Sequence, residues 1–296
     1  MKGRLLATVA LLAATAIWGS TFVVTKRSLT DLSPPSFLLW RFGLAAGVLV
    51  LARPRCVARL SRAERRQAVL LGVALAGGFL LQTFGLLHTL AGVSGFLTGA
   101  AVIFTPVVAA TLFGERVGRL GWVAVGGSAI GLALLAGGVT APSPASALLT
   151  LAGAAFFAVH ISGLSRWATR ANAYGMTALS VTVAAALCAA AALGHGGVSA
   201  PATRETWQAV LYLSLAATCA GFAVQAWAQS ALTAVTAAVV MTMEPVFAAV
   251  LAIAAGEHGL QWVGWVGGLV VVASMFLAEL GPRECCDALS PRVECC

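Results

Sequence analysis

The chain has 296 residues, of which 60% are hydrophobic and only 9% are charged. Soluble domains usually carry about 25% charged residues, so this composition excludes a water-soluble globular protein and indicates that the bilayer is the surrounding solvent. The formal net charge of +8 does not require a nucleic-acid partner, because the basic residues lie mostly between apolar runs, where they act as topology signals.

The first apolar run covers residues 5–25 and follows a basic start at Lys2 and Arg4. Its Ala14-Thr15-Ala16 segment is similar to the cleavage site of a signal peptide, which is the competing interpretation. The run continues past that site to the roughly 20 residues that a spanning helix needs, and this favours a membrane span. Nine further apolar runs follow, at 37–52, 68–89, 93–113, 120–137, 147–167, 174–193, 207–229, 235–255 and 262–280.

Two stretches of the chain share one plan. In residues 93–135, Thr105-Pro106 precedes Gly114-Glu115-Arg116, and in residues 235–277, Glu244-Pro245 precedes Gly256-Glu257-His258. This predicts two copies of a five-helix unit, at 1–137 and 147–280, with a linker at 138–146 and a disordered tail at 281–296. Aligning the prolines pairs Glu244 with Thr105, and it predicts that the first-half hairpin is about one helical turn shorter.

The loop charges indicate the topology. With the N-terminus in the cytoplasm, 14 basic residues lie in cytoplasmic segments and 3 lie on the opposite side. The bias predicts ten spans in a bacterial cytoplasmic (inner) membrane, with both termini cytoplasmic. Five is odd, so the two copies are expected in opposite orientations, as in secondary transporters whose site lies near the midplane between the halves.

Three features together carry a resemblance to a known family. They are the run from Ala16 to Phe22 (AIWGSTF), the Trp40-Arg41-Phe42 triplet and the paired Pro…Gly-Glu hairpins. Together they resemble the EamA-type transporters of the drug/metabolite transporter superfamily, over residues 6–280. The resemblance implies a cavity lined by the first, third and fourth helices of each half, with the fifth helices peripheral. It also implies transport of amino acids, other metabolites, sugars or drugs, often as export.

Two ionisable side chains at membrane depth are the first functional candidates. Glu244 precedes Pro245 in an apolar run and is a candidate for proton coupling, whereas the alternative is a structural ion pair with Arg41 or Lys26. Arg41 is a candidate site for an anionic group such as a carboxylate, whereas the alternative is a snorkelling or interhelical structural role. Pro245 and its counterpart Pro106 are expected to break or kink their helices.

Uncharged side chains complete the predicted site. His160 could shuttle protons or contact substrate, or it could simply form an interhelical hydrogen bond. Phe79 and Gln82 share one helix face, as do Phe222 and Gln225, and such glutamines orient a ligand or bond neighbouring helices. The predicted substrate-binding residues are Trp18, Phe79, Gln82, Thr98, His160, Phe222, Gln225, Thr242 and Glu244.

The remaining motifs argue against an enzyme. No phosphate-binding glycine-rich loop, Ser/His/Asp arrangement or His/carboxylate cluster is recognisable, so we predict no catalysis, no cofactor and no metal. Four of the seven cysteines lie in the tail (Cys285, Cys286, Cys295 and Cys296). Metal capture by these thiolates is the alternative to a disordered tail, but adjacent cysteines do not have the Cys-x-x-Cys zinc spacing.

The sequence thus predicts an all-α polytopic membrane protein of ten helices that works as a secondary active exporter of small organic metabolites such as amino acids. Its expected partners are the substrate, membrane lipid and protons, with the chain as a monomer or homodimer and without nucleic acid. Two alternatives remain: a drug or nucleoside transporter of the same fold, and a passive channel or non-transporting membrane scaffold.

Overall fold

The computed structural model describes residues 2–136, 143–254 and 262–280, and its regular structure there is entirely helical. The Gly256-Glu257-His258 motif and the four tail cysteines lie outside the described residues. The first half contains α1 (Lys2–Ser28), α2 (Pro34–Ala52), α3 (Pro54–Ala58), α4 (Arg62–Leu87), α5 (Ala91–Gly99), α6 (Ala101–Phe113) and α7 (Arg119–Leu135). The second contains α8 (Pro144–Trp167), α9 (Ala173–Gly194), α10 (Arg204–Tyr212), the π-helix η1 (Leu213–Ala220), α11 (Gly221–Gln229), α12 (Ala234–Met241), α13 (Met243–Ala254) and α14 (Trp262–Leu280).

The helix starts follow local capping chemistry. Ser61 and Glu64 form a reciprocal capping box at the start of α4, and the Thr233 hydroxyl accepts from the Thr236 N–H at the start of α12. Proline opens α2 and α8, where its missing N–H and fixed φ are compatible with the first turn. These signals place α2 at 19 residues rather than the shorter run expected from hydropathy, and they start α8 inside the expected linker.

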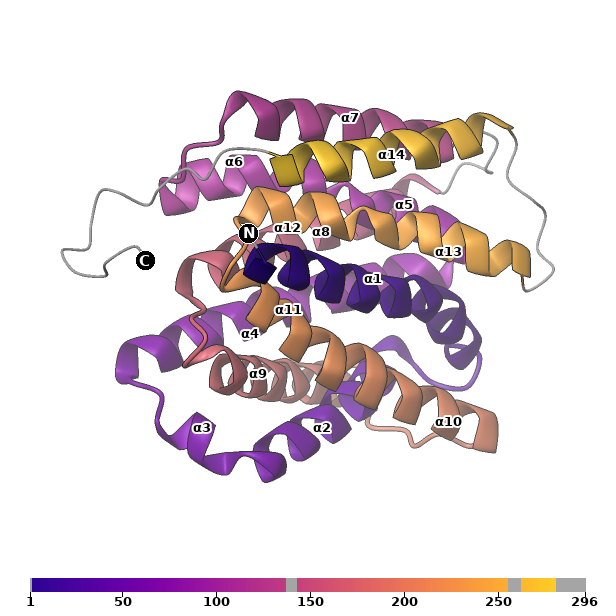
Figure 1. Cartoon of the computed structure of the whole chain (residues 1–296). Coiled ribbons are helices and arrows are strands. Elements are labelled where there is room, and N and C mark those ends of the chain that lie inside the picture. Colours follow the sequence, from indigo (N-terminus) through magenta and orange to yellow (C-terminus); the bar gives the residue numbers. More distant parts are fainter. Residues whose placement is uncertain (1, 137–142, 255–261, 281–296) are drawn as a thin grey trace.

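The helices are those of a polytopic membrane protein. Eight helical segments of the described chain have at least 18 residues and enough apolar character to cross a membrane, and α7 and α14 contribute two shorter apolar helices. The helices run alongside one another, with α7 and α14 side by side along one edge (Figure 1). A Cβ atom on Gly131 of α7 would lie only 2.8 Å from the Gly267 carbonyl oxygen of α14, so this glycine face is used within the chain.

The two halves interleave instead of forming separate lobes. Helix α4 of the first half packs along α8 and α9 of the second, and α2 also packs along α9. Glycines allow this close approach: a Cβ atom on Gly72 would lie 2.6 Å from the Ser180 carbonyl oxygen, and one on Gly153 would lie 2.9 Å from the Gly78 carbonyl oxygen. The interleaving brings residues of both halves around one central space.

Three of the expected continuous spans are interrupted, and the short helix α3 was not anticipated at all. Residue Ala100 separates α5 from α6, and Thr242 separates α12 from α13. The chain from Arg204 to Gln229 passes through η1. Helix α6 runs through Pro106, so the expected break at this proline is instead found six residues earlier; Pro245 lies in the first turn of α13, directly after the break at Thr242.

The two breaks correct the alignment of the halves. Ala100 and Thr242 are 142 residues apart, and this offset pairs Glu244 with Val102 rather than with Thr105. Counted along the sequence, fourteen residues separate Ala100 from Gly114, and fourteen separate Thr242 from Gly256. Measured from the helix breaks, the two intervals are therefore equal in sequence length, and the proline occupies a different turn in each half.

Candidate functional site

A cavity lies where the two halves meet. Its empty volume is about 720 Å³, a figure that includes open space at its mouth. The first half contributes α1, α2, α4, α5 and α6, and the second contributes α8, α11, α12 and α13. All nine residues predicted to bind substrate line it, as do Arg41 and Pro245, whereas Pro106 does not.

One wall of the cavity is aromatic, and Phe79 is at its centre. The ring centroid of Phe79 lies 5.1 Å from that of Phe42, 5.0 Å from Phe157 and 6.1 Å from Phe222, all in edge-to-face geometry. Trp18 extends this wall, with its ring 5.5 Å from that of Phe222. Such a wall packs against apolar or flat parts of a ligand and attracts cationic groups to its ring faces.

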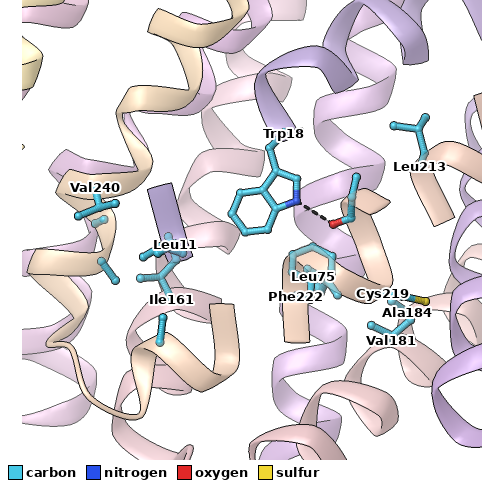
Figure 2. Close-up of a cluster of buried hydrophobic side chains, with 14 of the residues drawn as sticks. Leu11, Trp18, Leu75, Ile161, Val181, Ala184, Leu213, Cys219, Phe222 and Val240 are labelled. Carbon is cyan, nitrogen blue, oxygen red and sulfur yellow. Dashed lines mark hydrogen bonds between the residues drawn. The ribbon is translucent and has the colours of Figure 1, made fainter. Parts of the chain in front are cut away.

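The indole of Trp18 is fixed by the π-helix. Its Nε1–H donates to the Ala217 carbonyl oxygen at 2.8 Å, the bond drawn as a dashed line in Figure 2. Gly221 permits the approach, because a Cβ atom there would lie 2.7 Å from the same nitrogen. Trp18 is thus held by a bond that crosses from α1 to η1.

Arg41 supplies the cation of the cavity. Its side chain is only 2% exposed, its Nε–H donates to the Thr218 hydroxyl at 3.0 Å, and its guanidinium lies 4.6 Å from the Phe79 ring centroid. The two terminal amino groups have no hydrogen-bond partner among the described residues. Arg41 therefore does not snorkel to the membrane surface; it presents a nearly buried pair of free donors, the arrangement that a carboxylate fills bidentately.

The π-helix that holds both groups has an origin in the sequence. Gln67 and Gln208 begin corresponding segments and are 141 residues apart, whereas Gln82 and Gln225, which both line the cavity, are 143 residues apart. The second half thus contains two extra residues in this interval, and η1 accommodates them where α4 is regular. The wider turns redirect backbone and side-chain groups: the Thr218 hydroxyl donates to the Leu213 carbonyl, five residues earlier.

Glu244 faces Arg41 without touching it. The carboxyl lies in the first turn of α13 and lines the cavity, and no ion pair within 4.0 Å joins it to another described residue. Lys26 is unavailable as a partner, because its ammonium donates to the Leu86 and Leu87 carbonyl oxygens at 2.6 and 2.8 Å and caps α4. Among the described residues Glu244 thus forms no contact ion pair, but its charge and that of Arg41 still interact electrostatically. The Glu244 carboxyl group and the Arg41 guanidinium group therefore line the same cavity.

The uncharged polar side chains of the cavity differ in whether all their hydrogen-bonding atoms have partners. Gln82 donates to the Thr98 hydroxyl at 2.8 Å, and a ring nitrogen of His160 lies 3.2 Å from the Leu71 carbonyl oxygen. Gln225 donates its amide N–H to Gln229 at 2.8 Å, but its own Oε1 is buried without a partner. A buried acceptor without a donor is costly, so a ligand N–H or O–H at this position would be favoured.

Sequence reasoning missed two important contributors. Phe157 lies one helical turn before His160, so the helix face of His160 could have indicated it. Thr218 could not have been found by periodicity, because η1 changes the register of its helix before this residue. Among the described residues no group of three or more His, Cys, Asp or Glu side chains could hold a metal ion.

A polar contact closes the loops at one end of the bundle. The Asp31 carboxylate, between α1 and α2, accepts from the Ala202 N–H at 3.0 Å, and the Trp40 indole donates to the Ser199 carbonyl at 2.8 Å. A hydrogen bond from the Thr206 side chain, with that of Ala202, holds the pKa of Asp31 below its usual value. The contact ties the two halves together outside the cavity.

Duplicated helical halves, interrupted helices and a cavity between the halves that contains a few polar groups are typical of membrane transporters. The comparisons with known proteins agree. The EamA-like transporter family matches residues 5–137 and again 145–280, and the chain belongs to this family. A protein of Archaeoglobus fulgidus described as an uncharacterized transporter is 25% identical over 277 residues, which cover 94% of this chain and 87% of that protein. A solved crystal structure shares the fold with a TM-score of 0.76 at 18% identity, over 93% of this chain and 96% of that chain.

Proposed function

We propose that this membrane transporter moves small organic metabolites that carry both a carboxylate and a hydrogen-bond-donating group, with amino acids as the preferred case. The observation that carries the proposal is the nearly buried Arg41 guanidinium, which lines the cavity and whose two terminal amino groups have no partner among the described residues. A carboxylate would satisfy both donors in one planar contact.

The rest of the cavity complements the other end of such a molecule. Glu244 attracts an ammonium group, the unpaired Gln225 Oε1 accepts a hydrogen bond, and the wall around Phe79 packs against an apolar side chain. A simple organic cation would be attracted to the Glu244 carboxylate but repelled by the Arg41 guanidinium. The Glu244 carboxyl group and the Arg41 guanidinium group together therefore favour a zwitterionic substrate over a cationic drug.

The proposed mechanism is alternating access by two inverted halves, in ten spans with both termini in the cytoplasm of a bacterial cell, and in the direction of export. Glu244 couples transport to protons in this scheme, because a carboxyl in the cavity can take up a proton when the site faces one side and release it on the other. The interrupted helices support the scheme: Gly99, beside the first break, lies against Pro245, beside the second.

Counterflow in proteoliposomes tests this function. Vesicles loaded with an unlabelled amino-acid pool should take up labelled members of the same class faster than protein-free vesicles. Decarboxylated analogues of the same amino acids are the matched probes, and they should show no stimulation because they lack the group that Arg41 binds. Stimulation by a nucleoside or drug alone would replace the substrate class. Flux that needs no internal substrate would indicate a channel, and the absence of any flux with folded protein would indicate a scaffold.

A further inference from the structure

The segment between α2 and α4 carries a concentrated positive charge. Residues 53–66 contain six arginines and one acidic residue, Glu64, and all six arginine side chains are exposed. The segment lies where one apolar helix ends, at Ala52, and the next begins, at Arg62. This places it at the membrane surface.

The positive charge is not neutralised by contact with carboxylates in the described part of the chain. Both carboxylate oxygens of Glu64 are already used: one accepts from the Ser61 N–H and the other from the Asn172 side-chain amide, each at 2.8 Å. No carboxylate lies within 4.0 Å of any of the six guanidinium groups among the described residues. Four of the six arginine side chains (Arg55, Arg59, Arg62 and Arg66) make no contact with another described residue and are available to an external anion.

Part of the arginine cluster is held in position. Arg65 donates to the Leu60 carbonyl at 3.1 Å and to the Ala58 carbonyl at 2.9 Å, which folds its side chain over α3. The Arg53 guanidinium lies 5.2 Å from the ring of Tyr174, whose hydroxyl is bonded to the Leu49 carbonyl at 2.8 Å. Ordering these side chains in advance lowers the entropy cost of binding an anion.

Large apolar side chains flank the charges. Leu51 is 82% exposed at the end of α2, and Leu70 and Val69 of α4 are 58% and 40% exposed. A ligand with an anionic head and apolar chains would cover both kinds of surface. A nucleic acid or an acidic soluble protein would cover only the arginines, so the surroundings favour lipid.

We propose that residues 53–66 form a binding site for the phosphate headgroups of anionic phospholipids. The chains of the bound lipid lie against the exposed apolar side chains of α2 and α4. Clusters of four to eight basic residues beside a spanning helix are suited to this role through charge attraction at the membrane surface.

Lipid binding to the purified full-length protein in detergent tests the proposal. The test variant is Arg55→Gln with Arg59→Gln and Arg62→Gln, because these side chains make no described contact and their loss should leave the fold intact. The matched control changes three other exposed arginines, Arg27, Arg119 and Arg170, to glutamine and removes the same net charge. The affinity for phosphatidylglycerol is measured by native mass spectrometry against phosphatidylcholine, inorganic phosphate and a short RNA.

The wild type and the control variant are expected to prefer phosphatidylglycerol, and the test variant should bind it at least tenfold more weakly. Equal losses in the two variants would show that only net charge matters, and an unchanged test variant would show that the lipid lies elsewhere. Equally tight binding of inorganic phosphate, or tighter binding of RNA, would also overturn a lipid site. No transport is measured, so none of these results bears on the proposed substrate or mechanism.

Discussion

Thr218 offers the sharpest test of how the cavity is built. Its hydroxyl accepts from the Arg41 Nε–H at 3.0 Å and donates to the Leu213 carbonyl at 2.8 Å. Thr218→Val keeps the shape of the side chain but removes both bonds, and Thr218→Ser keeps them. The valine variant thus leaves a buried charged donor without its partner and removes the side-chain bond to the Leu213 carbonyl.

The expected cost follows from these two bonds. An unsatisfied buried group costs about 1–3 kcal/mol, and more when it is charged, so Thr218→Val should lower the free energy of unfolding by roughly 2 kcal/mol or more. Loss of positioning at Arg41 should also weaken the binding of a carboxylate substrate by about tenfold, which corresponds to about 1.4 kcal/mol. Thr218→Ser should restore both properties to near the wild-type values.

Two measurements check this expectation. Denaturant unfolding of the purified protein gives the stability change, and equilibrium binding gives the affinity for a carboxylate substrate and for its decarboxylated analogue. Thr182→Val is the matched control, because that hydroxyl bonds only to the Ala178 carbonyl of its own helix. The reasoning is refuted if Thr218→Val behaves like Thr182→Val, or if it weakens both ligands equally.

Three further changes probe packing, pH dependence and coupling. Gly72→Ala should destabilise the protein by about 1–3 kcal/mol in denaturant unfolding, since its Cβ would lie 2.6 Å from the Ser180 carbonyl oxygen. Gly126→Ala, which meets nothing within 4 Å, should be neutral or stabilising, and a similar loss there would contradict the packing argument. The lowered pKa of Asp31 means that its carboxylate stabilises the fold above the ordinary pKa of about 4 and loses this effect as the pH falls through the lower folded value. The stability gap between wild type and Asp31→Asn should therefore be present at pH 7 and vanish at low pH; a gap independent of pH would rule out this origin. Glu244→Gln should keep counterflow but abolish accumulation driven by a proton gradient, and unchanged accumulation would remove Glu244 from the coupling.

The helical class and the duplication were predictable because both depend on local features of the sequence. Apolar runs report burial in lipid directly, and repeated motifs such as Glu244-Pro245 survive divergence as recognisable spacings. The membership of the cavity was also predictable to a large extent. Polar or aromatic side chains such as Gln82 and Trp18 are costly or unusual in the middle of an apolar helix, so their positions alone predict that they face the protein interior and not the lipid.

Only the tertiary structure shows where the helices are interrupted and which residues of the two halves correspond. The breaks at Ala100 and Thr242 lie near the prolines but not at them: the first lies six residues before Pro106 and the second three residues before Pro245. The same breaks corrected the partner of Glu244 from Thr105 to Val102. A proline alignment compares residue types, whereas only the backbone shows which positions are equivalent.

The sequence by itself determined a membrane-embedded, all-helical, duplicated chain and most of the residues that line its central cavity, because hydropathy and residue type act locally. The three-dimensional structure alone decided how these residues are arranged. Arg41 pairs with Thr218 rather than with Glu244, and two extra residues in the second half form a π-helix that holds both Arg41 and Trp18. The Arg41–Thr218 and Trp18–Ala217 bonds join residues that are 177 and 199 positions apart in the sequence. Such contacts depend on the direction in which each helix points its side chains, and one inserted residue rotates that direction by about 100°.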